Sequence, residues 1–313
     1  MATKLTNVII PENFATYVDK VPLEQNNFYK SGVMERTAYF DTLASQGGYT
    51  ATMPYWGELD GDYVTRTDSD AGLPSFEKIN TGVEIAIKCF DKIAVGTGSL
   101  VSELAGSNAA EAIYRKIGQK LTTLDEKRLL ATLTGVFEST DMANNILTVT
   151  ESSFDNGAIV DAGQLLGDRQ DNIVAIAMHS KLYAKLKKLN LVTNHATLVS
   201  DITGAPIEFL GNKYVIVDDT LNDGTNTEAY LFKRGAVAYG RGGEEYPVEI
   251  GKLPHFEEEG ITVRKNHIFH VRGTSWAGTA GLINAGVELK KGTNWKLVYQ
   301  PKEVGVVKIK VTP

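Results

Sequence analysis

Histidine and cysteine are the residues from which this chain could build a metal or acid–base site, and it has five histidines and one cysteine. His267 and His270 lie three residues apart in an alternating segment, so a strand there would point them to opposite faces. His179 and His195 have no partner at a ligand spacing, and the H-E-x-x-H motif is absent. Cys89 is a single thiol, which excludes an intramolecular disulfide and favours a small buried hydrophobe. The sequence therefore predicts no metal site and no cofactor.

Two glycine-rich stretches suggest a nucleophilic serine and a phosphate-binding loop. Ser275 lies in residues 273–278, which are one residue too long for the G-x-S-x-G elbow and have no paired base in a recognisable position. Residues 96–99 resemble half of a dinucleotide-binding loop, but Val101 stands where the third glycine belongs, so we expect a turn there. A hydrolase built around Ser275 is the alternative from another functional class. Our expectation is a protein that is not an enzyme.

Four closely spaced aspartates suggest calcium: Asp60, Asp62, Asp68 and Asp70. The EF-hand pattern breaks at Val64, and the solubility of a polar loop explains these carboxylates more simply. The formal net charge of −6 argues against free nucleic-acid binding, because such proteins usually carry a basic face. The charge does not exclude DNA as confined cargo.

Four lysines lie on the polar side of one amphipathic helix: Lys181, Lys185, Lys187 and Lys188. They form a solvated face, a contact to acidic residues of a neighbour, or a phosphate contact, and the sequence does not rank these readings. No apolar run approaches the roughly 20 residues of a membrane span, and no signal peptide is visible. We therefore expect a protein that is made in a cytoplasm and has no membrane partner.

A large β-hairpin is the most unusual element that the pattern predicts. Residues 48–56 alternate, and residues 83–89 alternate again, with Val83, Ile85, Ile87 and Cys89 on one face and Glu84, Ala86 and Lys88 on the other. The polar connection, residues 57–82, is longer than the loops of compact domains, and an isolated two-stranded hairpin is marginal in water. The chain nearby offers no third strand, so a neighbouring subunit is the attractive support. A loose surface loop is the competing interpretation.

The first 45 residues have the character of an arm with isolated apolar anchors. Pro11 and Pro22 break the regular pattern, and we expect a short helix near Asn13 and another over residues 26–43. Such a segment docks either on another molecule or on its own domain. Residues of the hairpin and the arm are the candidate inter-subunit contacts: Tyr55, Trp56, Asp60, Asp62, Arg66, Asp68, Asp70, Phe14 and Tyr17.

The strongest helix signal covers residues 108–134. Asn108 and Glu111 have the spacing of a capping box, and Gly135 stands where a helix-ending glycine belongs. At 1.5 Å per residue this rod would be roughly 40 Å long.

A small α/β unit follows between residues 148 and 240. It has predicted helices over 158–169 and from Ser180, and predicted strands at 173–178, 214–217, 229–232 and 236–239. The last third is β-rich, with strands at 261–272, 296–299 and 304–311. In the first of these, Ile261, Val263 and Lys265 share one face.

Four stretches together resemble a known family: residues 175–192, 204–219, 230–240 and 260–276. Their order and spacing are similar to those of the major capsid (coat) proteins of tailed double-stranded DNA phages, which have the Hong Kong 97-type fold. The likeness spans nearly the whole chain. It implies an α+β fold with an N-terminal arm at 1–45 and an extended loop at 46–106 that lies over an adjacent subunit. It also implies a peripheral domain with a spine helix at 107–150 and 240–275, and an axial domain at 151–239 and 276–313.

The resemblance implies a structural protein of the virion capsid that self-assembles into hexamers and pentamers of an icosahedral head around double-stranded DNA. It implies as partners a portal and a possible decoration protein. Since no charged helical segment is visible before Asn13, it also implies either a separate scaffolding protein or a scaffolding segment that is missing from this sequence. Residues 57–77 contain no lysine, so we do not expect covalent crosslinking through this loop. The alternative within the same fold is a subunit of an encapsulin-like nanocompartment.

Overall fold

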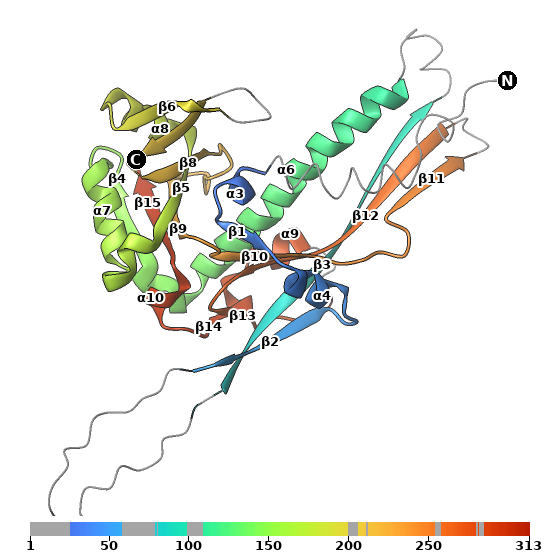
Figure 1. Cartoon of the computed structure of the whole chain (residues 1–313), viewed down its shortest axis with the longest axis horizontal. Coiled ribbons are helices and arrows are strands. Elements are labelled where there is room, and N and C mark those ends of the chain that lie inside the picture. Colours follow the sequence, from blue (N-terminus) through green and yellow to red (C-terminus); the bar gives the residue numbers. More distant parts are fainter. Residues whose placement is uncertain are drawn as a thin grey trace, which may run out of the picture.

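The computed structural model describes residues 26–57, 79, 81–98, 109–199, 206–210, 212–253, 258–279, 281 and 285–313. The fold is mixed α+β, as predicted, and has two parts (Figure 1). One is a body around a seven-stranded sheet. The other is a long ribbon of strands that runs away from this body, with a long helix beside it. Within the described residues, no helix is both long and apolar enough to cross a membrane.

The seven-stranded sheet forms the core of the body. Its strands follow the order β4 (Ile146–Thr150), β15 (Val306–Thr312), β9 (Thr227–Lys233), β5 (Ile173–Met178), β8 (Lys213–Val217), β7 (Pro206–Leu210) and β6 (Val192–Val199). β5 and β9 are almost entirely buried, as their continuous apolar runs predict. Helices α7 (Asn156–Gln164) and α8 (Ser180–Lys188) contribute apolar side chains to the same core. The helix predicted over 158–169 ends earlier, at Gln164. A 3-10 segment, Gly167–Asn172, follows it, and Gly167 at the start of this segment has φ 59°, which favours glycine.

The second sheet is organised around one very long strand, β3 (Thr81–Gly98). Residues 81–87 of β3 pair with β2 (Thr50–Trp56), and residues 88–98 pair with β12 (Glu258–Val271). β12 also pairs with β10 (Val237–Arg241) and β11 (Val248–Leu253). β12 is therefore a third strand of the same sheet, but it joins β3 only from Lys88 onward, so the hairpin ladder of residues 50–56 with 81–87 remains two-stranded. The pairing is distant in sequence, so local patterns do not show it.

The burial of the two faces of the predicted strand at 83–89 also differs from what the alternation suggests. Val83 is 46% exposed, whereas Glu84 and Lys88, on the supposedly polar face, are 2% exposed. Lys88 donates from Nζ to the carbonyl oxygen of Gln46, and Ala86 packs with Met53 in a small apolar cluster. Neighbouring elements cover both faces of this strand, so its alternation does not separate a buried face from an exposed one.

Residues 26–45 pack on their own chain, and the prediction of a single helix over 26–43 is wrong. The segment forms α3 (Asn27–Lys30), β1 (Met34–Arg36) and α4 (Ala38–Ser45), with a break where Gly32 adopts φ 75°. Phe28 is buried against Phe232, with ring centroids 6.0 Å apart. β1 extends the long sheet by pairing with β10. Phe14, Tyr17 and the helix predicted near Asn13 lie outside the described residues.

The long helix α6 (Ala109–Glu138) lies beside the ribbon and is about 45 Å long. It continues past Gly135, so the expected stop at this glycine is wrong. A Cβ at Gly135 would overlap the carbonyl oxygen of Leu289 and approach the Trp295 indole nitrogen, which itself donates to that oxygen at 2.9 Å. Glycine at this position permits a close helix crossing instead of ending a helix.

The remaining elements are short. They are the 3-10 segments Thr140–Asn145 and Gly292–Asn294, helices α9 (Ala285–Glu288) and α10 (Pro301–Val304), and the strand pair β13 (Thr274–Trp276) and β14 (Trp295–Leu297). Residues 96–98, where we expected a turn, are instead the end of β3 paired with residues 258–260 of β12.

Substitution of Gly135 tests the close crossing. We expect Gly135→Ala to lower the free energy of unfolding by about 1–3 kcal/mol, because the added methyl must push α6 away from Leu289. Gly163→Ala in α7 is the matched control, since its Cβ meets only Ile173 Cδ1 at 3.5 Å. The control should be neutral or about 0.5–1 kcal/mol more stable. Urea unfolding of both variants checks the difference, and equal effects would contradict the close-crossing role.

Candidate functional site

The residues that suggested catalysis have structural contacts. Ser275 on β13 is buried, and its Oγ accepts a hydrogen bond from the backbone N–H of Ile85 at 3.0 Å. Cys89 is buried, as predicted, and burial raises the pKa of its thiol to about 12. Among the described residues, no three His, Cys, Asp or Glu side chains are placed to share a metal ion.

The histidines do not converge. His270 Nε2 lies 3.0 Å from Glu84 Oε2, and His267 Nε2 lies 3.2 Å from Asp91 Oδ2. His179 caps α8, where its Nδ1 accepts from the backbone N–H of Lys181. The backbone of His195 is in β6, and His255 lies outside the described residues.

Two tyrosines fix the point where the hairpin leaves the body. The Tyr55 ring on β2 meets the Tyr299 ring edge to face, with centroids 4.8 Å apart. A Cβ at Gly82, opposite Tyr55 in the ladder, would overlap the Tyr55 ring. A Cβ at Gly273 would lie 2.9 Å from the Tyr299 ring. Two glycines therefore create the space that lets the aromatic pair connect the hairpin to the body. We call Tyr55, Trp56, Gly82, Glu84 and Tyr299 the hairpin root.

A buried carboxylate completes the hairpin root. Burial of Glu84 by itself favours the neutral acid, but contacts with His270 and Tyr299 and the positive charge of Arg272 outweigh it, and the pKa of Glu84 lies below its ordinary 4.5. Burial and the contact with the Glu84 carboxylate raise the pKa of Tyr299 to about 12. The carboxylate therefore holds β3, β12 and the segment after β14 together at one point.

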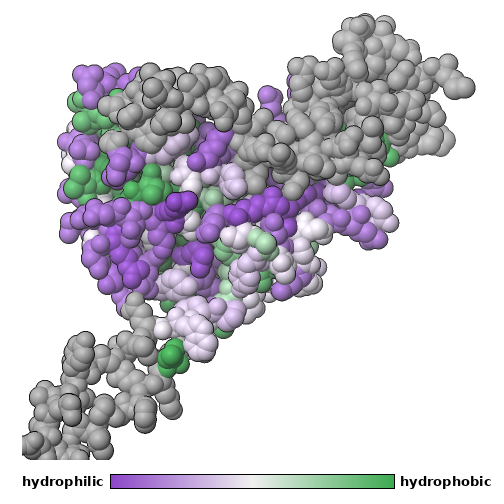
Figure 2. All heavy atoms as spheres, in the orientation of Figure 1, coloured by the Kyte–Doolittle hydropathy of each residue, from purple (hydrophilic) through white to green (hydrophobic). Residues whose placement is uncertain are grey.

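The hairpin root also exposes apolar surface. Trp56 is 75% exposed and Ile79 is 51% exposed. Figure 2 shows apolar atoms at the place where the described surface meets the hairpin connection. A pocket of about 420 Å³ opens beside Tyr55 and Trp56, lined also by Arg169, Lys233 and Glu303.

Of the candidate contact residues, the structure brings Tyr55 and Trp56 together at this root. The other candidates lie outside the described residues: Asp60, Asp62, Arg66, Asp68, Asp70, Phe14 and Tyr17.

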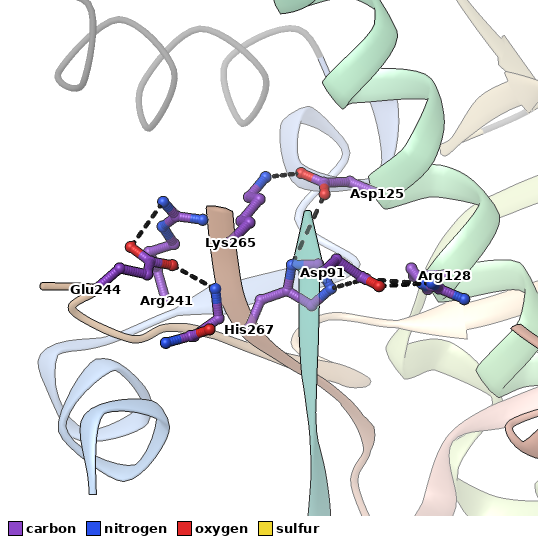
Figure 3. Close-up of polar contacts among 8 residues, drawn as sticks. Asp91, Asp125, Arg128, Arg241, Glu244, Lys265 and His267 are labelled. Atoms are coloured by element: carbon purple, nitrogen blue, oxygen red, sulfur yellow. Dashed lines mark hydrogen bonds and ion pairs between the residues drawn. The ribbon is translucent and has the colours of Figure 1, made fainter. Parts of the chain in front are cut away.

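A second polar cluster joins α6 to the ribbon (Figure 3). We call its five members the clasp: Asp91 of β3, Asp125 and Arg128 of α6, and Lys265 and His267 of β12. Arg128 binds Asp91 with two contacts, at 2.6 and 2.8 Å, and Lys265 Nζ binds Asp125 Oδ2. Burial opposes the charge of Asp91, but contacts with His267 and Arg128 hold its pKa far below the ordinary 3.8.

Local sequence patterns do not predict the clasp. One signal was present, because Lys265 shares the inward face with Ile261 and Val263, and the structure confirms that all three are buried. A lysine on a buried face needs an acidic partner, but its partner Asp125 is 140 residues away in the chain.

Three of the four α8 lysines bind their own chain. Lys181 Nζ lies 2.6 Å from Glu151 Oε2, and Lys185 donates to the carbonyl oxygens of Glu151 and Ser152. Lys187 donates to the Tyr183 hydroxyl at 3.1 Å. These contacts are intramolecular, a role that the solvated-face, neighbour-contact and phosphate-contact readings did not include.

Comparisons with known proteins find a family and several relatives that are similar to this chain over most of its length. The family described as Gp13-like, major capsid protein 13-like, matches residues 56–307. The major capsid protein of Bacillus phage SPP1 is 33% identical over 322 residues, covering 98% of each chain. Among solved structures, the capsid of Ralstonia phage GP4 has a TM-score of 0.62 at 12% identity and covers 92% of this chain and 91% of that one. The head structure of Helicobacter pylori bacteriophage KHP40 has a TM-score of 0.57 at 12% identity, covering 92% and 90%. At this identity the two structural likenesses show the fold.

Neutralising the buried carboxylate tests the hairpin root. We expect Glu84→Gln to lower the free energy of unfolding at pH 7 by about 1–3 kcal/mol, because His270 and Tyr299 lose a charged acceptor. A depressed pKa stabilises above the unfolded value, so the deficit should shrink as the pH falls below 4.5. Denaturant titrations from pH 3 to 8 measure this difference in the free energy of unfolding. Glu245→Gln, at an exposed position, is the control, and a deficit that stays constant over this range would refute the assignment.

Proposed function

The chain belongs to the Gp13-like family of major capsid proteins and is a structural protein of a phage capsid, and from this premise we propose how it builds the shell. It self-assembles into hexamers and pentamers of an icosahedral head that encloses double-stranded DNA. The family and the Hong Kong 97-type fold agree with the resemblance seen in the sequence. The virion capsid is the location that the family implies.

The hairpin root is the observation that carries the assembly proposal. β2 and β3 extend from the body as a two-stranded ribbon, and residues 57–80 connect them. The root is braced by the tyrosine pair, but Trp56 is 75% exposed. A lone ribbon is marginal in water, and a large exposed aromatic is typical of a contact hot spot. A neighbouring copy therefore covers Trp56 and the connection, with Asp60, Asp62, Arg66, Asp68 and Asp70 as further contact residues.

The two parts of the fold correspond to two domains of the shell subunit. The seven-stranded sheet with α7 and α8 supports an axial domain that lies at capsomer centres, and α6 with the long ribbon supports a peripheral domain with its spine helix. We place the boundary before β4 instead of at residue 151, because β4 pairs with β15 in the seven-stranded sheet. Residues 1–25, with Phe14 and Tyr17, act as an arm that contacts neighbouring copies.

Many copies of a weak contact stabilise such a shell, because closed symmetry repeats the contact around every capsomer. We propose a separate scaffolding protein, a portal and a possible decoration protein as further partners. DNA is cargo that is held without sequence-specific binding, and the net charge of −6 supports this. Assembly takes place in the cytoplasm of the bacterial host.

Ser275 has a structural contact in place of a catalytic role in this proposal. Ser275 Oγ accepts the Ile85 backbone N–H and so connects β13 to the hairpin strand β3. This contact gives the serine a structural purpose.

Removal of the Trp56 side chain tests the proposal. We expect Trp56→Ala to leave the fold of the subunit intact and to weaken each contact by about 2 kcal/mol, roughly thirtyfold in its association constant. Few or no shells should then form under conditions in which the wild-type chain assembles with its scaffolding protein. Negative-stain microscopy and sedimentation measure the assembled fraction. Tyr246→Ala, at a residue 62% exposed outside the hairpin, is the control. Normal shells from Trp56→Ala would exclude Trp56 as an essential contact.

A further inference from the structure

The pocket of about 420 Å³ beside the hairpin root contains a lysine that its own chain holds in one position. Lys233 of β9 lines the pocket, and a Cβ at Gly305 would overlap the methylene stem of this lysine. Gly305 has φ 67°, which favours glycine, and its carbonyl oxygen accepts the Lys233 backbone N–H at 2.8 Å. The side chain is therefore fixed before any partner binds, which lowers the entropy cost of binding.

The ammonium group of Lys233 lacks a carboxylate of its own chain. Its Nζ donates to the backbone carbonyl oxygen of Glu303, whose carboxylate instead binds Arg169 at 2.8 Å. Within the described part of the chain, no carboxylate lies at ion-pair distance from Lys233 Nζ. Burial and the positive charges of Arg272 and Arg169 lower the pKa of Lys233, so the cations oppose one another here. A carboxylate that a binding partner brings would balance this charge.

The other residues that line the pocket are neutral and partly aromatic: Tyr55, Trp56, Gly57, Val298, Tyr299 and Gln300. With Arg169, Lys233 and Glu303 added, the lining has two cations and one acid, so its formal charge is +1. Trp56 is 75% exposed, so a segment that covers it also excludes water from the pocket beside it. Loss of this water strengthens an ion pair to Lys233, because the local dielectric constant falls.

The chain has a segment of the complementary charge. Residues 57–80, which connect β2 to β3, contain six acidic and two basic residues, so their net charge is −4. The net charge of the whole chain is −6, so most of the excess negative charge lies in this connection. A connection of 24 residues that returns to its start reaches at most roughly 40 Å from the root, close to the length of α6. The connection of one copy is therefore long enough to reach the root of a neighbour.

We propose that the pocket beside the hairpin root receives a carboxylate from the hairpin connection of a second copy, with Lys233 as its ion-pair partner. This inference rests on the proposed assembly and names the contact that covers Trp56. The contact joins the root of one copy to the connection of the next, so the two partners use different surfaces. Such a head-to-tail contact forms closed rings when its rotation closes, which is the arrangement that a capsomer needs.

Zero-length carbodiimide crosslinking of assembled shells without DNA tests the contact, because it joins a lysine only to a carboxylate that lies against it. The shells are assembled from an equal mixture of ¹⁴N-labelled and ¹⁵N-labelled subunits, so a link between two copies gives peptide pairs of mixed isotope. We expect mass spectrometry to find Lys233 linked to an acidic residue of 57–80 in mixed pairs. Lys188, exposed on α8, is the control and should give no such link.

Two results would overturn the inference. Pairs of a single isotope would mean that the connection binds the root of its own chain. A Lys233 that forms no link to residues 57–80 would mean that this segment is not the partner of the pocket. Shells that never form contradict the assembly proposal and this inference with it, whereas shells that form without the Lys233 link contradict this inference alone.

A neutral variant measures how much the ion pair contributes. Lys233→Gln keeps a donor near the Glu303 carbonyl oxygen but removes the charge. We expect the subunit to fold as the wild type does, by circular dichroism, and the protein concentration needed for shell assembly to rise roughly tenfold. Lys188→Gln is the matched control and should assemble at the wild-type concentration. An unchanged threshold for Lys233→Gln would contradict the ion pair, and if this variant does not fold, crosslinking of the wild-type shells decides.

Discussion

The architecture depends on β3 pairing with two different strands in succession. Its first half belongs to the hairpin with β2, and its second half belongs to the ribbon with β12. A strand that passes from one partner to the next transmits any shift of one partner to the other, because residues within a strand have fixed spacing. The direction of the projecting hairpin is therefore set by how β3 is held along its length, more than by the hairpin's own sequence.

Two polar clusters hold β3, one in its hairpin half and one near the start of the half that pairs with β12. At the hairpin root, Glu84 contacts His270 and Tyr299. Seven residues further along the strand, Asp91 contacts Arg128 of α6 and His267 of β12. Apolar packing tolerates small slips, whereas paired buried charges leave an unpaired charge if they slip, which is costly. Ionic contacts at two points thus fix the register of a strand whose apolar residues alone would not specify it.

The sequence was informative where structure is local. The continuous apolar run of β5, the alternation of Ile261, Val263 and Lys265, and the amphipathic helix α8 all follow from spacing alone. It was misleading where a distant segment decides the outcome. Gly135 is a place of close approach to Leu289, and Glu84 and Lys88 have the alternation of a solvated face although both are buried by segments distant in the sequence. The sequence pointed to Tyr55 and Trp56 at the candidate site, because aromatics at a hairpin end are visible locally. It missed Tyr299 and the clasp, whose members come together only through long-range pairing.

The position of β15 in the seven-stranded sheet has a consequence for biosynthesis. β15 lies between β4 and β9, although it follows both by many residues in the chain. While the chain emerges from the ribosome, β4 and β9 face an unfilled gap, and the sheet closes only after the segment that contains β15 has been translated. We expect this closure to be slow, since it brings together segments about 160 residues apart, such as Lys308 and Ile146. A chain in which β15 has not yet joined the sheet therefore has an incomplete body.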